Sequence, residues 1–249
     1  MDELIVIDDG SLDESCEKLN GFPISIHKIR KNKGRGFVRN LAMKLCKNDL
    51  VLCCDATNSL ESNFLKIAIK HFHNDPNVCS VSGIIKAKSV DGVVSRWRSR
   101  HLFKEDLSYP PDHITKTSLV TYGTLVRKSL IMKAGNFDAK LSHSEDEDLG
   151  QRLINLGLKS LGNPKLITYS EVNNSLFQVL ERHWRWHIGK NEDLTVKSYL
   201  NLIRGSLNPM MRYDLKAGDP LASLISLTYP HFFLMKTLAN KFRQRRSYL

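Results

Sequence analysis

The chain has 249 residues, 41% hydrophobic and 25% charged, a composition that excludes an intrinsically disordered protein. Lysine and arginine outnumber aspartate and glutamate by 37 to 26, and the formal net charge is +11. Such an excess predicts an anionic partner: nucleic acid, a membrane surface or a phosphorylated small molecule. The five cysteines show no zinc-binding spacing, so we expect reduced thiols and a cytoplasmic location.

Short apolar runs alternate with helical patterns from the amino terminus onwards. This alternation predicts an α/β fold whose mostly parallel sheet is flanked by helices. Beyond Lys190 the strand signal fades, so we expect one domain at residues 1–190 and a helical tail at 191–249. The expected strands are Leu4–Asp8, Pro23–Ile29, 50–55 and 78–87, and the expected helices are Phe37–Cys46, Asn63–Phe72 and a third beginning near Asp148.

The tail contains the most apolar stretch of the chain, Leu221–Ala239. Pro230, His231 and Lys236 interrupt it, so it lacks the roughly 18 uninterrupted apolar residues that a spanning helix needs. A basic segment, "NKFRQRR", follows. The pattern predicts either a helix lying on the inner face of a membrane, with its basic end on anionic headgroups, or helices docked on the core. The amino terminus lacks the basic segment of a signal peptide.

Acidic residues follow two of the predicted strands, where ligands bind in open α/β sheets. Asp8 and Asp9 precede Gly10 and Ser11, so their carboxylates can either accept hydrogen bonds from a nucleoside or form an ordinary turn. Asp55 ends an apolar strand, where an ionised group is costly unless it is paired or bound to a metal such as Mg²⁺ or Mn²⁺.

A basic, glycine-containing segment, "NKGRGFVRN", precedes the first predicted helix. Gly34 lets the backbone approach a ligand closely, while Lys33, Arg35 and Arg39 supply positive charge. Helix N-termini bind anions, so this loop predicts a phosphate site, although a simple surface loop would have the same composition.

Four consecutive carboxylates, in "EDED", begin the third predicted helix. The helix dipole explains Glu147 and Asp148, and Asp148 is spaced for an i,i+4 pair with Arg152. The dipole accounts less well for Glu145 and Asp146. Crowded carboxylates raise one another's pKa, as a general base near neutral pH requires.

The order of five motifs resembles that of the family 2 inverting glycosyltransferases, which have a Rossmann-like GT-A fold. The resemblance covers roughly Leu4 to Gly189, and the strongest block is "RKSLIMKAGNFDAKL…EDEDLGQRL". The motifs are "IVIDDGSLDES", "NKGRGFVRN", "DATN", the block ending in "EDEDLGQRLINLG", and "RHWRW".

The resemblance implies a role for each matching residue. Asp146 would be the catalytic base that deprotonates the acceptor hydroxyl. The implied donor site comprises Asp8 and Asp9 at the nucleoside, Gly34, Arg35 and Arg39 near the diphosphate, and Asp55 at a divalent metal, Mg²⁺ or Mn²⁺. The implied acceptor site comprises Gly123, Thr124, Glu145, Arg185 and Trp186. Helix packing is the alternative for Trp184 and Trp186.

Three departures from the family pattern bear on the donor site. Thr57 replaces the second acid of the DxD-type motif, and no histidine follows the "KLITYSE" strand. The chain also begins at what would be the second strand of the family domain, so we expect an N-terminally truncated donor pocket.

Two functions remain open at this point. The first is transfer of a sugar from a nucleotide-sugar donor to a polysaccharide, lipid-linked or protein-glycan acceptor, as in cell-wall or polysaccharide synthesis. The second is a catalytically silent relative that only binds or scaffolds. Nucleic-acid binding by the basic, aromatic run "SRWRSRHLFK" is not expected, because no nucleic-acid motif accompanies it.

Overall fold

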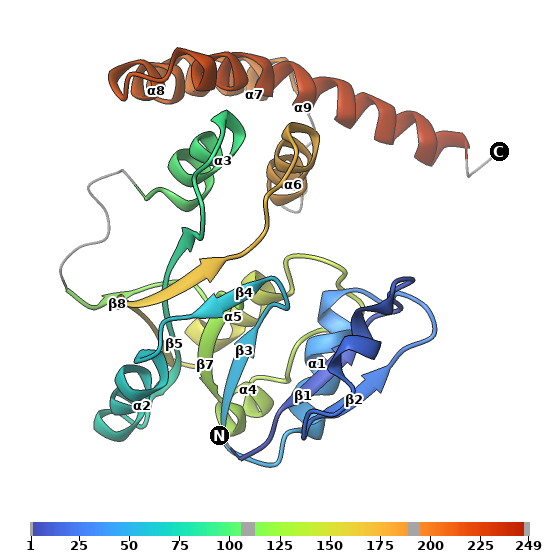
Figure 1. Ribbon diagram of the computed structural model, residues 1–249, viewed down its shortest axis with the longest axis vertical. Helices are drawn as coiled ribbons and strands as arrows, with labels where there is room; N and C mark the ends of the chain where they lie inside the picture. Colours follow the sequence, from blue (N-terminus) through green and yellow to red (C-terminus); the bar gives the residue numbers. More distant parts are fainter. Residues whose placement is uncertain (1, 106–112, 189–194, 247–249) are drawn as a thin grey trace. The chain divides into compact units, whose positions relative to one another are not determined.

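The computed structural model describes residues 2–105, 113–188 and 195–246, with the backbone alone at 186–188 and 242–246 (Figure 1). The chain forms two compact units. The first unit comprises Met1–Ile85 and Pro110–Tyr169, and the second comprises Lys86–Tyr109 and Ser170–Leu249. This division differs from the boundary expected at residue 190, because Val93–Arg98 and Leu176–Ile188 pack with the C-terminal helices.

The first unit has an α/β architecture, as predicted. Its elements in chain order are β1 (Ile5–Asp8), a 3₁₀ helix (Glu14–Leu19), β2 (Ser25–Lys28), α1 (Arg35–Leu45), β3 (Leu50–Cys54), β4 (Asn58–Leu60), α2 (Phe64–Asn74), β5 (Val78–Ala87), β6 (Thr115–Lys116), β7 (Gly123–Arg127), α4 (Lys128–Lys133), α5 (Glu145–Asn155) and β8 (Lys159–Ser170).

The strands form a parallel pair, β1 with β2, and a larger sheet in the order β3-β7-β5-β8-β4, with β6 beside β8. This larger sheet is mixed, which corrects the expected mostly parallel arrangement. Strand β7 lies between β3 and β5 and runs antiparallel to both, with Val126 opposite Val51 and Ser80. Strands β3 and β5 therefore run in the same direction, with β7 reversed between them; β6 and β8 also pair antiparallel.

Helices cover both faces of the larger sheet. Adjacent residues of β7 point to opposite faces, as in any strand. Val126 packs in one cluster with residues of α1, α4 and α5, whereas Leu125 packs with the α2 residues Phe64, Ala68 and Phe72. In Figure 1, α2 accordingly lies away from α4 and α5. This packing fixes the first turns of α1 and α5 near the strand ends.

The second unit is helical. Its elements are α3 (Val93–Arg98), a π-helical turn (Ser99–Phe103), α6 (Leu176–Ile188), α7 (Val196–Gly205), a second π-helical turn (Ser206–Met211), α8 (Arg212–Lys216) and α9 (Pro220–Arg246). Its core is built around Trp97, Trp184, Tyr229 and Phe233. Among the described helices, none has the length and apolar character needed to cross a membrane.

The run "SRWRSRHLFK" forms α3 and the turn after it. Trp97, Arg98 and Arg100 are 0%, 2% and 6% exposed, so they contribute to the interior of the second unit. These side chains are not available to contact a nucleic-acid backbone.

Candidate active site

The acidic pair at the end of β1 shapes the backbone around it. The Asp9 carboxylate accepts hydrogen bonds from the backbone amides of Lys33, at 2.7 Å, and Gly34, at 2.9 Å. Asp8 accepts from the Ser11 amide at 3.0 Å, and its hydrogen bonds with Ser11 hold the pKa of this carboxyl below its usual range. The structure therefore brings Asp9 together with the predicted phosphate loop.

Gly34 lies where this loop packs against Ser142, in the segment that precedes α5. Its φ of +90° lies in the region that favours glycine, and an added Cβ would lie 2.7 Å from Cα of Ser142. The amide of Gly36 donates to the Leu141 carbonyl at 2.9 Å. The start of α1 is thus held against the segment that leads into α5. Arg35, the first residue of α1, is exposed.

Arg39 is the centre of the site. It extends from α1, donates to Oδ1 of Asp55 at 3.2 Å and forms an ion pair with Glu145. The side chains of Arg39, Asp55 and Glu145 are 13%, 43% and 1% exposed. One guanidinium therefore joins the end of β3 to the first residue of α5.

The four carboxylates of α5 have different environments. Glu145 is buried against Arg39, whereas Asp148 pairs with Arg152 at 2.6 Å, which confirms the predicted i,i+4 pair. Asp146 is partly exposed, has no ion-pair partner among the described residues, and accepts the Glu147 amide at 3.0 Å. Of the two acids that the dipole explained less well, Glu145 is committed to an ion pair and Asp146 is accessible.

Gly123 and Thr124 begin β7 beside the end of β3. The register places Gly123 opposite Cys54 and Thr124 opposite Cys53, one and two residues before Asp55. A Cβ at Gly123 would lie 2.3 Å from the Thr168 hydroxyl oxygen, so only glycine fits there. Thr124 is fully buried. Their acceptor-binding role stays a prediction.

The "RHWRW" motif lies on α6, in the second unit. Trp184 is 7% exposed, and its Nε1 donates to the Thr237 hydroxyl at 2.9 Å, which confirms the packing alternative for this residue. Arg185 is exposed, and the side chain of Trp186 lies outside the described residues. Acceptor binding by Arg185 and Trp186 stays a prediction.

The metal-binding capacity of the site is limited to Asp55. Thr57 offers no carboxylate, and the side-chain amide of Asn58 donates to the Tyr122 carbonyl at 2.7 Å. Within the described part of the chain, no three His, Cys, Asp or Glu residues are close enough to hold an ion. A single exposed carboxylate fits an ion that obtains most of its ligands from water and a bound diphosphate, as Mg²⁺ usually does.

Sequence reasoning identified the separate parts of this site but missed the pairing of Arg39 with Glu145. These residues lie on different elements and are separated by the whole of β3, α2, β5 and β7. The only available signal was the coincidence of a basic residue in the loop motif and a surplus acid in "EDED".

Comparisons with known proteins identify a family and a fold. The family model described as Glycosyl transferase family 2 matches residues 1–135. Poly-beta-1,6-N-acetyl-D-glucosamine synthase of Staphylococcus aureus (strain COL) is 22% identical over 200 residues, which are 77% of this chain and 48% of the relative. Pre-mycofactocin glycosyltransferase of Mycobacterium tuberculosis (strain CDC 1551 / Oshkosh) is 28% identical over 164 residues, 63% of this chain and 34% of the relative.

The chain spans less than half the length of these two relatives. A crystal structure of GalNAc-T7 with UDP, GalNAc and Mn²⁺ superposes with a TM-score of 0.53 at 14% identity, covering 68% of this chain and 37% of that one. The superposition supports the predicted GT-A fold.

Proposed function

The chain belongs to glycosyl transferase family 2, and we propose that it transfers a sugar, with inversion, from a nucleoside diphosphate donor to an acceptor hydroxyl. The observation that carries this proposal is the Arg39 bridge. It joins the end of β3 to the start of α5 and leaves Asp146 accessible beside a basic loop. The names of the two relatives, a polysaccharide synthase and a glycosyltransferase, support the same class of reaction.

Asp146 would be the general base. Its carboxylate is partly exposed and free of ion pairs among the described residues, so it can accept a proton from an acceptor hydroxyl. The hydroxyl oxygen would then attack the anomeric carbon while the bond to the diphosphate breaks. General base catalysis contributes about 10²- to 10⁴-fold to the rate.

Arg39 would stabilise the charge that develops on the departing diphosphate. Glu145 holds the guanidinium in place before any ligand binds, and such preorganisation is the main source of electrostatic stabilisation in active sites. Lys33 and Arg35 would add positive charge from the loop, whose shape Asp9 maintains through two backbone hydrogen bonds.

A divalent ion, Mg²⁺ or Mn²⁺, would enter with the donor. Asp55 would supply one oxygen ligand, and the ion would neutralise charge on the diphosphate. The Mn²⁺ and UDP bound by GalNAc-T7 support this part of the proposal. The remaining donor contacts, Asp8 at the nucleoside and Gly34 near the diphosphate, are proposed on the same basis.

The proposed acceptor is a glycan, either a polysaccharide or a lipid-linked or protein-bound chain. The polymer named for the Staphylococcus relative favours the polysaccharide. We place the reaction in the cytoplasm, at the inner face of a membrane. All five cysteines are free, as in a reducing compartment.

The decisive experiment compares Asp146→Asn with its exposed neighbour Glu147→Gln. Nucleotide release is measured with UDP- and GDP-sugars, Mn²⁺ and a membrane extract as the source of acceptors, and UDP binding is measured by calorimetry. We expect Asp146→Asn to lose about 10²- to 10⁴-fold in turnover with unchanged UDP affinity, while Glu147→Gln stays near wild type. Wild-type turnover in Asp146→Asn would exclude this residue as the base.

A catalytically silent relative is the second candidate, and the observation that favours it is the single carboxylate at the metal position. A silent relative would show neither nucleotide release nor metal-dependent heat on titration with UDP or GDP.

A further inference from the structure

We propose that helices α7 and α9 form a docking surface for an anionic lipid bilayer. The surface is defined by the outward face of α9 and the adjoining face of α7. The inference extends the membrane placement given under the proposed function, but it does not depend on the catalytic step, since it concerns only residues of the second unit.

Between Leu221 and Leu238, the outward face of α9 carries no Lys, Arg, Asp or Glu side chain. Its exposed positions follow a spacing of three and four residues, so they form a single stripe along the helix. Leu221, Leu224, Met235 and Leu238 are 61%, 55%, 71% and 45% exposed. The stripe consists of Leu221, Leu224, Thr228, His231, Met235 and Leu238.

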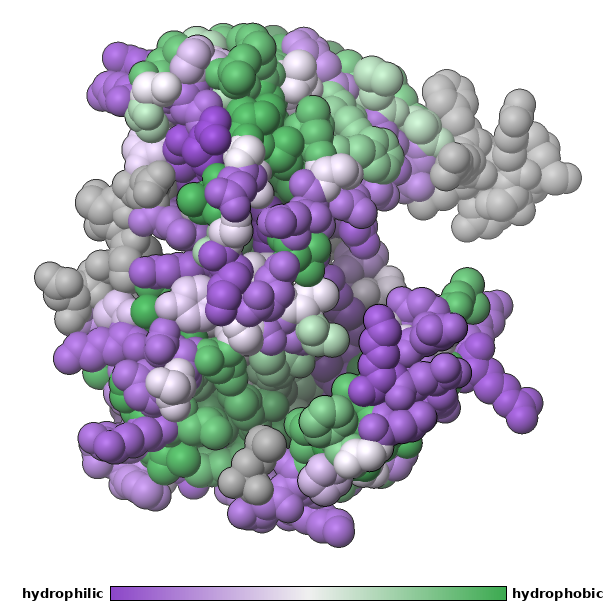
Figure 2. All heavy atoms as spheres, viewed as in Figure 1, coloured by the Kyte–Doolittle hydropathy of each residue, from purple (hydrophilic) through white to green (hydrophobic). Residues whose placement is uncertain are grey.

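Helix α7 extends this apolar surface. The Tyr199 hydroxyl lies 2.8 Å from Nδ1 of His231, which places α7 directly beside the stripe. Val196 and Leu200, on the same helix, are 79% and 58% exposed. Figure 2 shows hydrophobic side chains at the surface over these helices, with hydrophilic ones around them. A contiguous apolar surface with a polar rim is typical of an interaction site.

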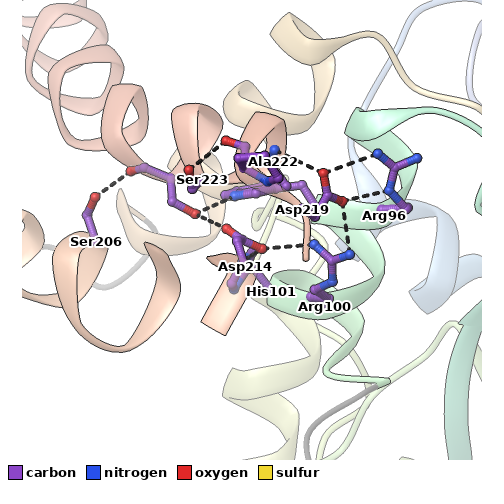
Figure 3. A network of polar contacts seen from close by, with 11 residues as sticks. Arg96, Arg100, His101, Ser206, Asp214, Asp219, Ala222 and Ser223 are labelled. Carbon is purple, nitrogen blue, oxygen red and sulfur yellow. Dashed lines mark hydrogen bonds and ion pairs between the residues drawn. The ribbon is translucent and has the colours of Figure 1, made fainter. Parts of the chain in front are cut away.

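The exposed charges of α7 and α8 are all cationic, and Glu181 of α6 pairs with Lys236 of α9 at 3.1 Å. From Thr195 to the C-terminus the sequence contains nine lysines and arginines but only two acids, Asp214 and Asp219. Both acids are turned inward, and Figure 3 shows them between Arg96, Arg100 and His101.

Asp214 is 0% exposed and Asp219 is 6% exposed. Because this buried network removes both acidic side chains of this segment from the surface, the exposed charges of α7 and α8 are cationic: Lys197, Arg204, Arg212 and Lys216.

An anionic bilayer complements this surface better than a second copy of the chain does. Exposed Leu and Met side chains with Lys and Arg beside them are the combination that interfacial helices present to an anionic membrane. A symmetric dimer through the same stripe would bring the cations of α7 and α8 of both copies together, and such like-charge contacts are unfavourable. Because no described helix can span a bilayer, we expect α9 to lie along the surface.

The test is vesicle co-sedimentation of the full chain with phosphatidylcholine alone and with added phosphatidylglycerol. The stripe variant is Leu224→Glu/Met235→Glu. The matched control is Ile154→Glu/Leu156→Glu in the first unit, where the native side chains are 52% and 48% exposed. We expect wild type and control to sediment only with the anionic vesicles, and the stripe variant to lose about tenfold or more in affinity.

A charge variant, Lys197→Gln/Arg204→Gln, separates the electrostatic contribution from the apolar one. Each cation near an anionic surface contributes about fivefold to binding. We therefore expect the vesicle affinity of this variant to lie between those of wild type and the stripe variant, and added salt to lower the affinity of wild type in the same way. A milder stripe variant, Leu224→Ser/Met235→Ser, keeps the test valid if the glutamates prevent folding, which circular dichroism would show.

Three results would overturn the proposal. The first is wild-type protein that stays in the supernatant with anionic vesicles. The second is equal sedimentation of the stripe variant and its matched control. The third is a wild-type protein that is dimeric by light scattering and does not bind vesicles, together with a stripe variant that is monomeric. The surface would then be the contact between two copies of the chain.

Discussion

Each unit contains one cluster of ion pairs between arginine and carboxylate side chains, and the two clusters differ in their exposure to solvent. In the first unit Arg39 meets Asp55 and Glu145, and the Asp55 side chain remains 43% exposed. In the second unit Asp214 is wholly buried and accepts from Arg100, His101 and Ser226 at 2.7 to 3.0 Å. Only the first cluster is open to a ligand.

The difference indicates how to separate a structural ion pair from a functional one. A buried polar network whose members all have partners rigidifies the interior, and removal of one partner leaves a buried charge uncompensated. A charged group that is held in position but still accessible can act on a ligand. Mutations in the second cluster should therefore affect folding, and mutations in the first should affect binding.

The largest expected effect is that of Asp214→Asn. This change removes the carboxylate that Arg100 and His101 share and leaves Arg100 paired with Asp219 alone. Breaking a buried ion pair by removing one partner typically costs about 3–5 kcal/mol. All three tryptophans belong to the second unit, so tryptophan fluorescence during urea unfolding reports on it directly. Asp91→Asn, at an exposed position of the same unit, is the control. Equal stability of the two variants would remove the distinction between the clusters.

Acid should destabilise the second unit through Asp219. Its hydrogen bond from Arg96, followed by that from Arg100, holds the pKa of this carboxyl well below its usual range. The stabilisation is therefore complete above the ordinary aspartate pKa and is lost as pH falls from about 4 towards the folded-state value. Thermal melts followed by tryptophan fluorescence should show this loss in wild type and a flatter profile in Asp219→Asn. Superimposable profiles would contradict the assignment.

A smaller effect is expected from Arg39→Lys in the first cluster. The ammonium keeps the charge but cannot bridge Asp55 and Glu145 as the planar guanidinium does. We expect UDP affinity to fall about tenfold, or about 1.4 kcal/mol, in calorimetric titrations. Unfolding of the second unit should be unchanged, as it should be in the exposed control Arg204→Lys. A variant that binds UDP normally would show that Arg39 has only a structural role.

The smallest effect is expected for an exposed pair. Lys88 and Glu171 lie 3.6 Å apart with side chains 57% and 43% exposed. Solvent screening limits such pairs to about 1 kcal/mol or less, so Lys88→Gln should barely shift the urea midpoint. A loss comparable to that of Asp214→Asn would show that burial is not what distinguishes the two clusters.

Local sequence signals were sufficient for individual elements. The apolar run before Asp55 predicted β3, and the run Val78–Ala87 is β5 with the expected bounds. The apolar spacing after Asp148 predicted the core-facing side of α5, where Leu149 and Leu153 are buried. These elements were predictable because their patterns arise from neighbouring residues.

Long-range pairing was not predictable in the same way. The position of β7 between β3 and β5 depends on strands far apart in the chain, and no local pattern marks its antiparallel direction. Arg100 belongs to a basic run that carries no local signal of burial, yet it pairs in the interior with Asp214 and Asp219, more than a hundred positions later. Burial of charge is decided by such distant partners.

The hydrogen bonds of Asp9 determine which groups of the loop at Lys33 can bind a ligand. The loop amides of Lys33 and Gly34 already donate to this carboxylate. Recognition at this loop then falls to the exposed side chains of Lys33 and Arg35, which add to the charge of Arg39. Attraction of that kind decays over a Debye length of about 10 Å at 0.1 M salt, so the ionic strength of the surroundings would set how tightly a diphosphate is held.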